Sequence, residues 1–254
     1  MDKRGQATLF IILGIVLVVI IVLLFTTKTI ELPRRSVESS QVSNIDAYVE
    51  SCISKEVKDL LVGLRKQGGM TNPGGCYPDN CYYDDGRTKY YYIVENNGGQ
   101  FAKHIGDEET MRDYLSGQVK NLLNNNGVCD PCKRFQDIQC GNFDVTTFSN
   151  NEKIMINVNS DKLIFTKGGS DVNVGEINLV INDDFFKGYG FVKKIADENM
   201  KVEWFNVYNY LSGQFTDLNV RIEGSPVANG DIRLFYVWVG DGTEEEAFYF
   251  AIKK

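Results

Sequence analysis

The most distinctive feature of the hydrophobic pattern is a continuous apolar run near the start of the chain. Residues 9–25 read LFIILGIVLVVIIVLLF, and no charged residue lies between Gly5 and Thr27. A helix of about 20 apolar residues spans the roughly 30 Å hydrocarbon layer of a bilayer. Core helices of soluble domains keep a polar face, which this run lacks. We therefore predict a membrane anchor over residues 1–27, with the lipid bilayer as the partner of residues 7–27.

A cleaved secretory signal peptide is the closest alternative to a retained anchor. The run is longer than the roughly 7–15 residues of a signal-peptide core, and TTKTIELP after it has no small-x-small cleavage site. Basic residues are nearly balanced across the run, with Lys3 and Arg4 before it and Lys28, Arg34 and Arg35 after it. The cysteines and most of the chain follow the run. We therefore expect a single-pass cell-membrane protein with a short cytoplasmic N-terminus and an extracytoplasmic C-terminal domain.

After the anchor the pattern becomes polar and then helical. Residues 28–42 are polar and contain Pro33, which predicts a stalk. Ser43 followed by Asp46 is similar to a capping box, and apolar residues then recur at helical spacing as far as the glycine pair 68–69. Paired glycines end helices because they adopt the left-handed backbone conformation without strain. A first helix is therefore predicted from Ser43 to this glycine pair.

A hairpin and a second helix follow in the pattern. Residues 82–94 contain two apolar and aromatic runs around the turn Asp84-Asp85-Gly86, which is a hairpin signal. Residues 107–123 have an acidic first turn and apolar residues at helical spacing, which predicts a helix. We group residues 43–142 as a Cys-containing helix–hairpin–helix region.

From residue 143 the pattern is mainly that of strands. A hairpin turn is predicted at 159–161, a slip at Gly175, and a second hairpin turn at 240–242. Strands are predicted at 154–158, 163–165, 172–181, 218–222, 232–239 and 247–252, and a helix at 191–200. Residues 143–254 thus form an antiparallel β-rich region with one or two helices. The fold class is α+β, as one domain or as two halves.

Charge and residue usage exclude several classes of function. The chain has 27 Lys and Arg against 34 Asp and Glu, a net charge of -7, whereas nucleic-acid binding needs a basic surface. His104 is its only histidine, which excludes chemistry that relies on several imidazoles. No nucleophile motif surrounds any Ser or Cys, and His104 is interpreted as an ordinary helix-entry residue. We therefore expect a non-enzymatic protein with no catalytic, metal or cofactor-binding residue and no nucleic-acid partner.

The six cysteines offer the most chemistry: Cys52, Cys76, Cys81, Cys129, Cys132 and Cys140. An even number outside a membrane predicts three disulfides, although six cysteines allow fifteen pairings. Cys76 with Cys81 and Cys129 with Cys132 flank Pro-containing turns and are candidates for local loops, which leaves Cys52 and Cys140 for a long one.

Two other uses of the cysteines remain open. Cys129, Cys132 and Cys140 with one earlier cysteine would supply the ligands of a four-thiolate zinc or iron–sulfur site. Alternatively, Cys129 and Cys132 form a redox pair, although they follow a helix rather than opening one after a strand.

Carboxylate and tyrosine groups are weaker candidates for ligand binding. The carboxylates at Asp183-Asp184, Asp84-Asp85 and Asp241 with Glu244-Glu245-Glu246 lack the spacing of a calcium loop and are interpreted as solvated turns. Tyrosines stand at positions 77, 82, 83, 90, 91 and 92. They form either a platform for a glycan or a protein partner, or the two faces of a strand pair.

The first residues of the chain carry a family resemblance. Lys3-Arg4-Gly5-Gln6 directly before an apolar helix resembles the class III signal of archaeal type IV pilin-like proteins, in which a prepilin peptidase cuts between Gly and Gln. The resemblance implies processing between Gly5 and Gln6 and self-assembly or an envelope protein as partner. Phe10 stands where archaeal pilins usually carry a Glu that pairs with a neighbouring subunit. The resemblance therefore implies anchoring more directly than filament assembly.

A second resemblance covers the first predicted helix. The run YVESCI at 48–53 and the helix end Gln67-Gly68-Gly69 are similar to a set of uncharacterised membrane-anchored proteins from small-genome archaea. Together these features predict a surface-exposed, pilin-like structural or adhesion component of an archaeal cell envelope. The alternative hypothesis is an envelope thiol–disulfide protein or a four-cysteine zinc protein that uses Cys129 and Cys132.

Overall fold

The computed structural model describes thirteen stretches of the chain: residues 35–72, 82–84, 87–97, 100–124, 127–136, 138–150, 152–167, 170–173, 175–202, 206–207, 218–224, 232–239 and 246–254. Residues 1–44 and 45–254 are separate compact units, and of the first unit only residues 35–44 are described. The predicted anchor and the Gly5–Gln6 processing site lie outside the described residues. Within these thirteen stretches, no helix has the length and apolarity to cross a membrane.

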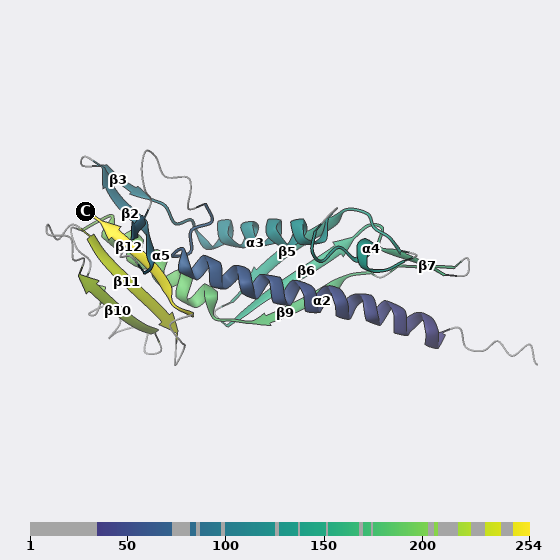
Figure 1. The fold of residues 1–254 in the computed structure, drawn as a ribbon. Coiled ribbons are helices and arrows are strands. Elements are labelled where there is room, and N and C mark those ends of the chain that lie inside the picture. Colours follow the sequence, from purple (N-terminus) through teal and green to yellow (C-terminus); the bar gives the residue numbers. More distant parts are fainter. Residues whose placement is uncertain are drawn as a thin grey trace, which may run out of the picture. The chain divides into compact units, whose positions relative to one another are not determined.

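The described elements are helices and mainly antiparallel strands, so the α+β class predicted from the sequence is confirmed (Figure 1). The helices are α2 (Arg35–Lys66), α3 (Glu108–Leu123), α4 (Pro131–Arg134) and α5 (Phe185–Asn199). Strands β1 (Tyr82–Asp84), β2 (Lys89–Asn97), β3 (Gln100–Lys103), β10 (Leu218–Gly224), β11 (Ile232–Val239) and β12 (Phe248–Lys253) form one sheet. Strands β5 (Phe143–Ser149), β6 (Lys153–Ser160) and β9 (Ile177–Asn182) form a second, and β4 (Ile138–Gln139), β7 (Ile164–Lys167) and β8 (Ser170–Asn173) a third.

Helix α2 begins at Arg35, eight residues before the predicted start at Ser43. The helix therefore includes residues 35–42 of the predicted stalk, and Ser43 lies inside the helix instead of capping it. No proline or glycine lies between Pro33 and Ser43, so nothing in this part of the sequence interrupts helical hydrogen bonding. The apolar residues that predicted the helix are 0–2% exposed: Ile45, Val49, Ile53, Val57, Leu61 and Leu64.

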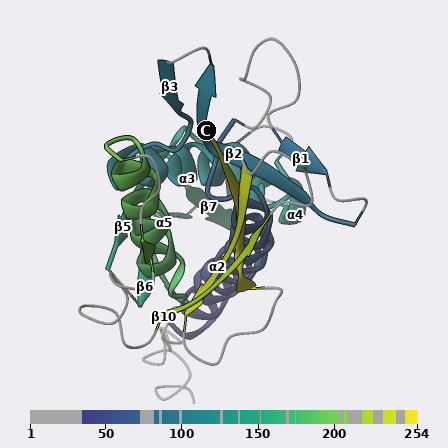
Figure 2. The same cartoon turned by 90° about the vertical axis from the view of Figure 1, so that its left-hand side faces the viewer.

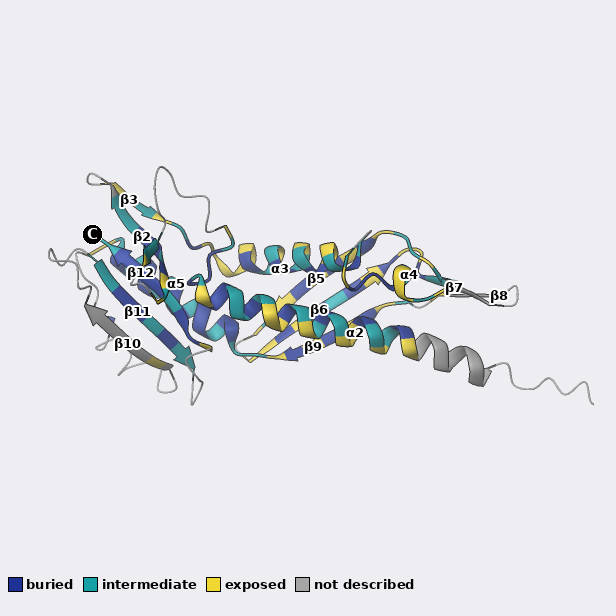
Figure 3. Cartoon of the chain, viewed as in Figure 1, coloured by how far each residue is buried: buried dark blue, intermediate teal, exposed yellow. Residues whose placement is uncertain are grey.

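The three-stranded sheet β5–β6–β9 buries one face and exposes the other. Buried and exposed residues alternate along all three strands (Figure 3). Helix α3 packs on β5, and its residues at helical spacing are fully buried: Met111, Leu115, Val119 and Leu123. Figures 1 and 2 place α2 along the same face of this sheet. The outer face carries Phe148, Met155 and Val180 side by side in one cross-strand row, 53%, 39% and 57% exposed.

The predicted hairpin around residues 159–161 is wrong. A turn does follow β6, but β6 pairs with β5 and β9, whereas β7 pairs with β4 and β8 in another sheet. Both edges of β6 are occupied by longer partners, so β7 has no edge of β6 to join. The predicted strand over 172–181 is divided at the expected slip, where Gly175 has φ 79°.

The six-stranded sheet combines strands from both halves of the chain. The β1–β2 hairpin and the three C-terminal strands were predicted, and the order β1–β2–β12–β11–β10 confirms the antiparallel pairs. Strand β12 also runs parallel to β2, so strands from segments 43–142 and 143–254 share one sheet. Helix α5 packs on this sheet and begins at Phe185, not near residue 191. Glycines at 188 and 190 interrupt the helical pattern of the sequence, so the first turns of α5 were not predicted. A Cβ on Gly188 would lie 2.5 Å from the Phe248 ring.

The glycine pair that ends α2 brings the helix end into the core. Gly68 and Gly69 have φ 63° and 81°, and their N–H groups donate to the carbonyls of Arg65 and Leu64. These bonds satisfy carbonyl groups that the helix end leaves without intrahelical partners. A Cβ on Gly69 would lie 2.7 Å from the Tyr189 ring. Glycine is therefore required here by both backbone conformation and space.

We expect Gly69→Ala to lower the free energy of unfolding by about 2–3 kcal/mol, because alanine is strained at positive φ and displaces a packed ring. The measurement is urea unfolding of the full-length chain in detergent. Gly63→Ala is the control, since nothing lies within 4 Å of a Cβ at this α2 position. That change should raise stability by roughly 0.5–1 kcal/mol through helix propensity. Equal losses in both variants would contradict the packing described here.

Candidate functional site

Two disulfides join cysteines of the described residues. Cys52 in α2 bonds to Cys129 in the turn after α3, with the two Cα atoms 5.7 Å apart and a sequence separation of 77. Cys132 in α4 bonds to Cys140, which follows β4, with a Cα–Cα distance of 6.1 Å and a separation of 8 residues. Disulfide bonding is thus confirmed for these four cysteines. The suggested pairings Cys129–Cys132 and Cys52–Cys140 are wrong.

Helix α4 explains why Cys129 and Cys132 have different partners. Asp130 is 6% exposed and caps α4, accepting a hydrogen bond from the Cys132 N–H at 2.9 Å, and Pro131 occupies the first helical position. Cys129 precedes this turn and is fully buried, where it reaches α2. Cys132 follows the turn and reaches the end of β4. The remaining cysteines, Cys76 and Cys81, lie outside the described residues.

A further contact holds the same part of α2 against the loop after α3. The Tyr48 hydroxyl donates to the Val128 carbonyl at 3.4 Å. The Tyr48 ring also meets the Phe135 ring edge-on, with centroids 5.4 Å apart. The disulfide between Cys52 and Cys129 therefore lies within a packed contact that positions both sulfur atoms.

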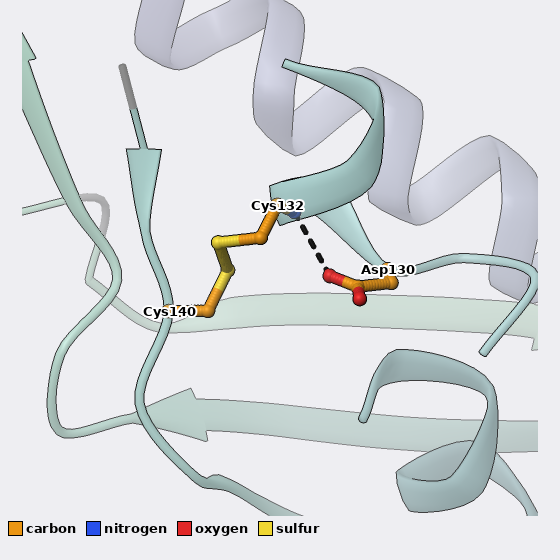
Figure 4. Close-up of side chains that lie close together, drawn as sticks. All are labelled: Asp130, Cys132 and Cys140. Carbon is orange, nitrogen blue, oxygen red and sulfur yellow. Dashed lines mark hydrogen bonds between the residues drawn. A yellow bond between two sulfur atoms is a disulfide. The ribbon is translucent and has the colours of Figure 1, made fainter. Parts of the chain in front are cut away.

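Asp130, Cys132 and Cys140 form the one group of potential metal ligands found among the described residues. Their ligand atoms all lie within 4.8 Å of one another (Figure 4). Zinc and iron–sulfur clusters bind thiolates, but these two sulfur atoms are bonded to each other. The Cys129 sulfur, which the predicted four-thiolate site also needs, is bonded to Cys52 in α2. In this oxidised form the cluster is a covalent crosslink between α4 and β4, and Cys129 and Cys132 are not a redox pair with each other.

The carboxylates Asp183 and Asp184 bind an arginine rather than lying free in a turn. Arg65, near the end of α2, is 4% exposed, and its Nη2 lies 2.6 Å from Asp183 Oδ1 and 3.2 Å from Asp184 Oδ1. The Phe185 N–H donates to Asp183, and the guanidinium lies 5.6 Å from the Phe185 ring centroid. Burial raises the pKa of the Asp184 carboxyl above its ordinary value, and the Arg65 charge opposes this shift. The group ties α2 to the junction of β9 and α5.

The other acidic candidates lie near strand ends or outside the described residues. Asp84 ends β1 opposite Lys89 of β2. Glu246 is exposed, two residues before β12 begins. Asp85, Asp241, Glu244 and Glu245 lie outside the described residues. Calcium binding by these groups therefore has no geometric support in the part of the chain that the structure describes.

His104 lies between β3 and α3, at the helix entry that the sequence predicted. Its N–H donates to the Ile93 carbonyl at 2.9 Å, which continues the pairing of β2 and β3. Its Nε2 atom is buried and has no hydrogen-bond partner within the described residues. The hydrogen bond of His104 to Ile93 is therefore made by its backbone, in the connection from β3 to α3.

The tyrosines of the hairpin divide between the two faces of the six-stranded sheet. Tyr90 and Tyr92 are buried, and the Tyr90 ring lies 5.5 Å from the Tyr236 ring and 6.2 Å from the Tyr249 ring. The hydroxyl groups of Tyr90 and Tyr236 are hydrogen-bonded to each other. Tyr82, Tyr83 and Tyr91 are partly exposed, and Tyr77 lies outside the described residues. Most of these rings therefore pack within the sheet, as a strand pair requires.

A cationic groove is the feature that the sequence interpretation missed. It lies between the end of α2 and the start of β2, with a volume of about 560 Å³. Its walls are formed by Gly63, Lys66, Gln67, Arg87, Thr88, Lys89, Tyr91 and Tyr249. Lys66 is more than 20 residues from the other two cations, so no local motif indicates their proximity. The adjacent residues Arg87-Thr88-Lys89 were the only sequence signal.

We expect the two disulfides to stabilise the chain unequally. In the chain-entropy model, loss of the 77-residue crosslink by Cys52→Ser with Cys129→Ser costs about 4–5 kcal/mol of unfolding free energy. Loss of the 8-residue crosslink by Cys132→Ser with Cys140→Ser costs about 2–3 kcal/mol. Urea unfolding of the full-length double variants measures both values. Peptide mapping without reductant checks the pairing, and recovery of a Cys52–Cys140 peptide would contradict it.

Removal of the Arg65 guanidinium should leave two carboxylates without their counter-ion. We expect Arg65→Met to lower the free energy of unfolding by about 3 kcal/mol. Adding Asp183→Asn and Asp184→Asn should recover part of this loss, because asparagine removes the charge and keeps an oxygen that accepts from the Phe185 N–H. Lys194→Met is the control on α5, where the partly exposed pair with Glu198 should contribute much less than the Arg65 cluster. Similar losses for Arg65→Met and Lys194→Met would show that the Arg65 cluster is not a buried ion pair.

No protein-family model, curated protein or solved structure matches the chain. Inference about its function therefore depends on the residues and geometry of the chain itself.

Proposed function

We propose that this chain is a single-pass, surface-exposed and non-enzymatic protein of the cell envelope, pilin-like at its N-terminus, with a structural or adhesion role. The observation that carries the proposal is the pair of disulfides, Cys52–Cys129 and Cys132–Cys140, in the domain that follows the apolar run. Structural disulfides form and persist in oxidising compartments and are rare in the cytosol. An anchored domain with such crosslinks fits the outside of a cell membrane.

The environment of the long-range disulfide favours a structural use of its cysteines. Cys129 is fully buried, and the surrounding contact between Tyr48 and Phe135 holds the two segments together. Redox-active cysteines are accessible and lie in surroundings that stabilise a thiolate. A buried crosslink between α2 and the loop after α3 instead constrains the unfolded chain.

The polar clusters of the described residues also have structural partners. Asp130 caps α4, Asp183 accepts a hydrogen bond from the N–H of Phe185 at the start of α5, and Arg65 binds Asp183 and Asp184. These contacts give Asp130, Asp183 and Asp184 structural partners without any reaction. They support a structural or binding role for the domain.

The outer face of β5–β6–β9 supports contacts with other envelope proteins. Phe148, Met155 and Val180 form a row of exposed apolar side chains on neighbouring strands. Contiguous apolar surface on a soluble domain is typical of interaction sites. This row is consistent with a protein that assembles with other chains.

The test is the intact mass of the protein extracted from its native membranes, without reductant and with free thiols blocked. We expect a mass that begins at Gln6 and is lower by six hydrogens, one pair for each of three disulfides among the six cysteines. Gly5→Val is the control, because removal of the glycine before the cut should leave residues 1–5 in place. A mass that begins at Met1 with blocked thiols would overturn the proposal and place the domain in the cytoplasm.

A further inference from the structure

Strand β9 forms one edge of the sheet β5–β6–β9, and this edge faces solvent. Of the described strands, only β6 pairs with β9, and Figures 1 and 3 show β9 as an outer strand of the sheet. Its alternate residues Asn178, Val180 and Asn182 are exposed. An outer strand presents backbone N–H and C=O groups that can pair with a strand of another chain.

A hydrogen bond just beyond β9 shows which of its backbone groups point to the open edge. The Asp183 N–H donates to the Glu152 carbonyl at 3.0 Å, and the register of β9 with β6 continues from this pair without a break. In an antiparallel ladder, every second residue directs both its backbone groups to the same partner strand. The odd-numbered residues of β9 therefore bond to β6. The even-numbered residues, Asn178, Val180 and Asn182, direct their backbone groups to the open edge.

This edge lacks the features with which proteins protect outer strands. Residues 177–182 read INLVIN, with no charge and no proline, and no bulge interrupts their pairing with β6. Lysine, proline and bulges usually protect such edges against pairing with other chains. In a chain with a net charge of -7, a neutral edge can meet its own copy without like-charge repulsion. The charge pattern therefore favours a second copy of this chain as the partner.

The open edge is also symmetric about Val180. When two β9 strands meet antiparallel with Val180 opposite Val180, Asn178 lies opposite Asn182. All of these residues direct their backbone groups to the open edge, so each facing pair can exchange two hydrogen bonds. The exposed row of Phe148, Met155 and Val180 then continues into the same row of the second copy. A two-fold axis through Val180 satisfies both the backbone and the apolar row.

The opposite edge of the sheet is less suited to such pairing. Strand β5 carries an exposed charge at Asp144, which β9 lacks. Helix α3 is bonded to β5, because the Ser116 hydroxyl donates to the Thr147 hydroxyl oxygen at 2.9 Å. Pairing of β9 with β5 of another copy would also leave an open edge at each end, and so would produce long chains of copies.

We propose that β9 pairs antiparallel with β9 of a second copy around a two-fold axis through Val180, which joins two three-stranded sheets into one. The proposal names the partner of the exposed apolar row, and it rests on the proposed assembly role for its biological setting. The Val180 side chains of the two copies lie directly opposite each other, where cross-strand apolar pairs stabilise a sheet.

The first experiment measures the mass of the full-length chain in detergent by sedimentation equilibrium over a range of protein concentrations. We expect an equilibrium between monomer and dimer. Val180→Lys should weaken the dimer about tenfold or more, because like charges directly opposite on paired strands repel. The monomer should keep its fold, since Val180 is 57% exposed. A chain that is monomeric at every concentration, or that forms oligomers larger than a dimer, would overturn the proposal.

Phe148→Lys is the matched control for Val180→Lys. Phe148 is 53% exposed on the same face of the sheet, but it lies on β5, two strands from the open edge. Its dimer affinity should stay within about twofold of that of the unmodified chain, as expected for a surface change away from the contact. An equal loss in both variants would show that the sheets stack face to face, and edge pairing would be wrong.

A mixture of charge variants tests the axis itself. Val180→Asp should weaken the dimer as Val180→Lys does, for the same reason. An equimolar mixture of the two variants should dimerise at least about fivefold more tightly than either alone, because opposite charges then face each other across the axis. Only a pairing with residue 180 of both copies in opposition predicts this recovery. A mixture as weak as the separate variants would overturn the register.

These outcomes also separate the pairing from the location of the domain. A mass that begins at Gln6, without a dimer that depends on Val180, removes the partner and leaves the surface function standing. A dimer that depends on Val180, in a chain that begins at Met1, supports the pairing and overturns the surface function.

Discussion

The other described contacts of the domain depend on the burial of one apolar stripe on α2. The stripe runs from Ile45 to Leu64 and is almost completely hidden from solvent. Near one end of this stripe, the bond from Cys52 to Cys129 fixes α2 to the loop after α3. At the other end, Arg65 binds the junction of β9 and α5, and the glycine pair passes directly beneath the six-stranded sheet. A helix held in this way sets the position of every element that touches it.

The same arrangement links stability to the geometry of the cationic groove. Arg65 and Lys66 are neighbours in the last turn of α2, yet one points into the core and the other lines the cationic groove. The ion pair with Asp183 and Asp184 therefore fixes the helix end that carries Lys66. The groove depends on the sheet as well, since Lys89 and Tyr91 alternate along β2 between buried residues. The geometry of the groove is therefore set by the packing of α2 and β2 in the core.

Elements with a clear local period could be predicted from the sequence. Helix α3 has an acidic start at Asp107 and a regular apolar spacing, and β11 is a dense apolar run, so both were located within a residue. Features decided by distant partners could not be predicted. The pairing of Cys52 with Cys129 depends on where α4 turns the chain, and the separation of β6 from β7 depends on β5 and β9. The cationic groove belongs to this second group, because tertiary packing alone brings Lys66 to β2.

The position of β12 has a consequence for how the domain is made. This strand is the last of the described strands in the chain, yet it lies in the middle of the sheet, hydrogen-bonded to β11 on one side and to β2 on the other. Its register with β2 joins residues more than 150 positions apart, and such pairings are slow to form. While the chain is being synthesised, the edge of β2 that pairs with β12 stays unpaired until residues 248–253 emerge. The crosslink from Cys52 to Cys129 involves only earlier residues, so oxidation can restrain the unfinished chain during that interval.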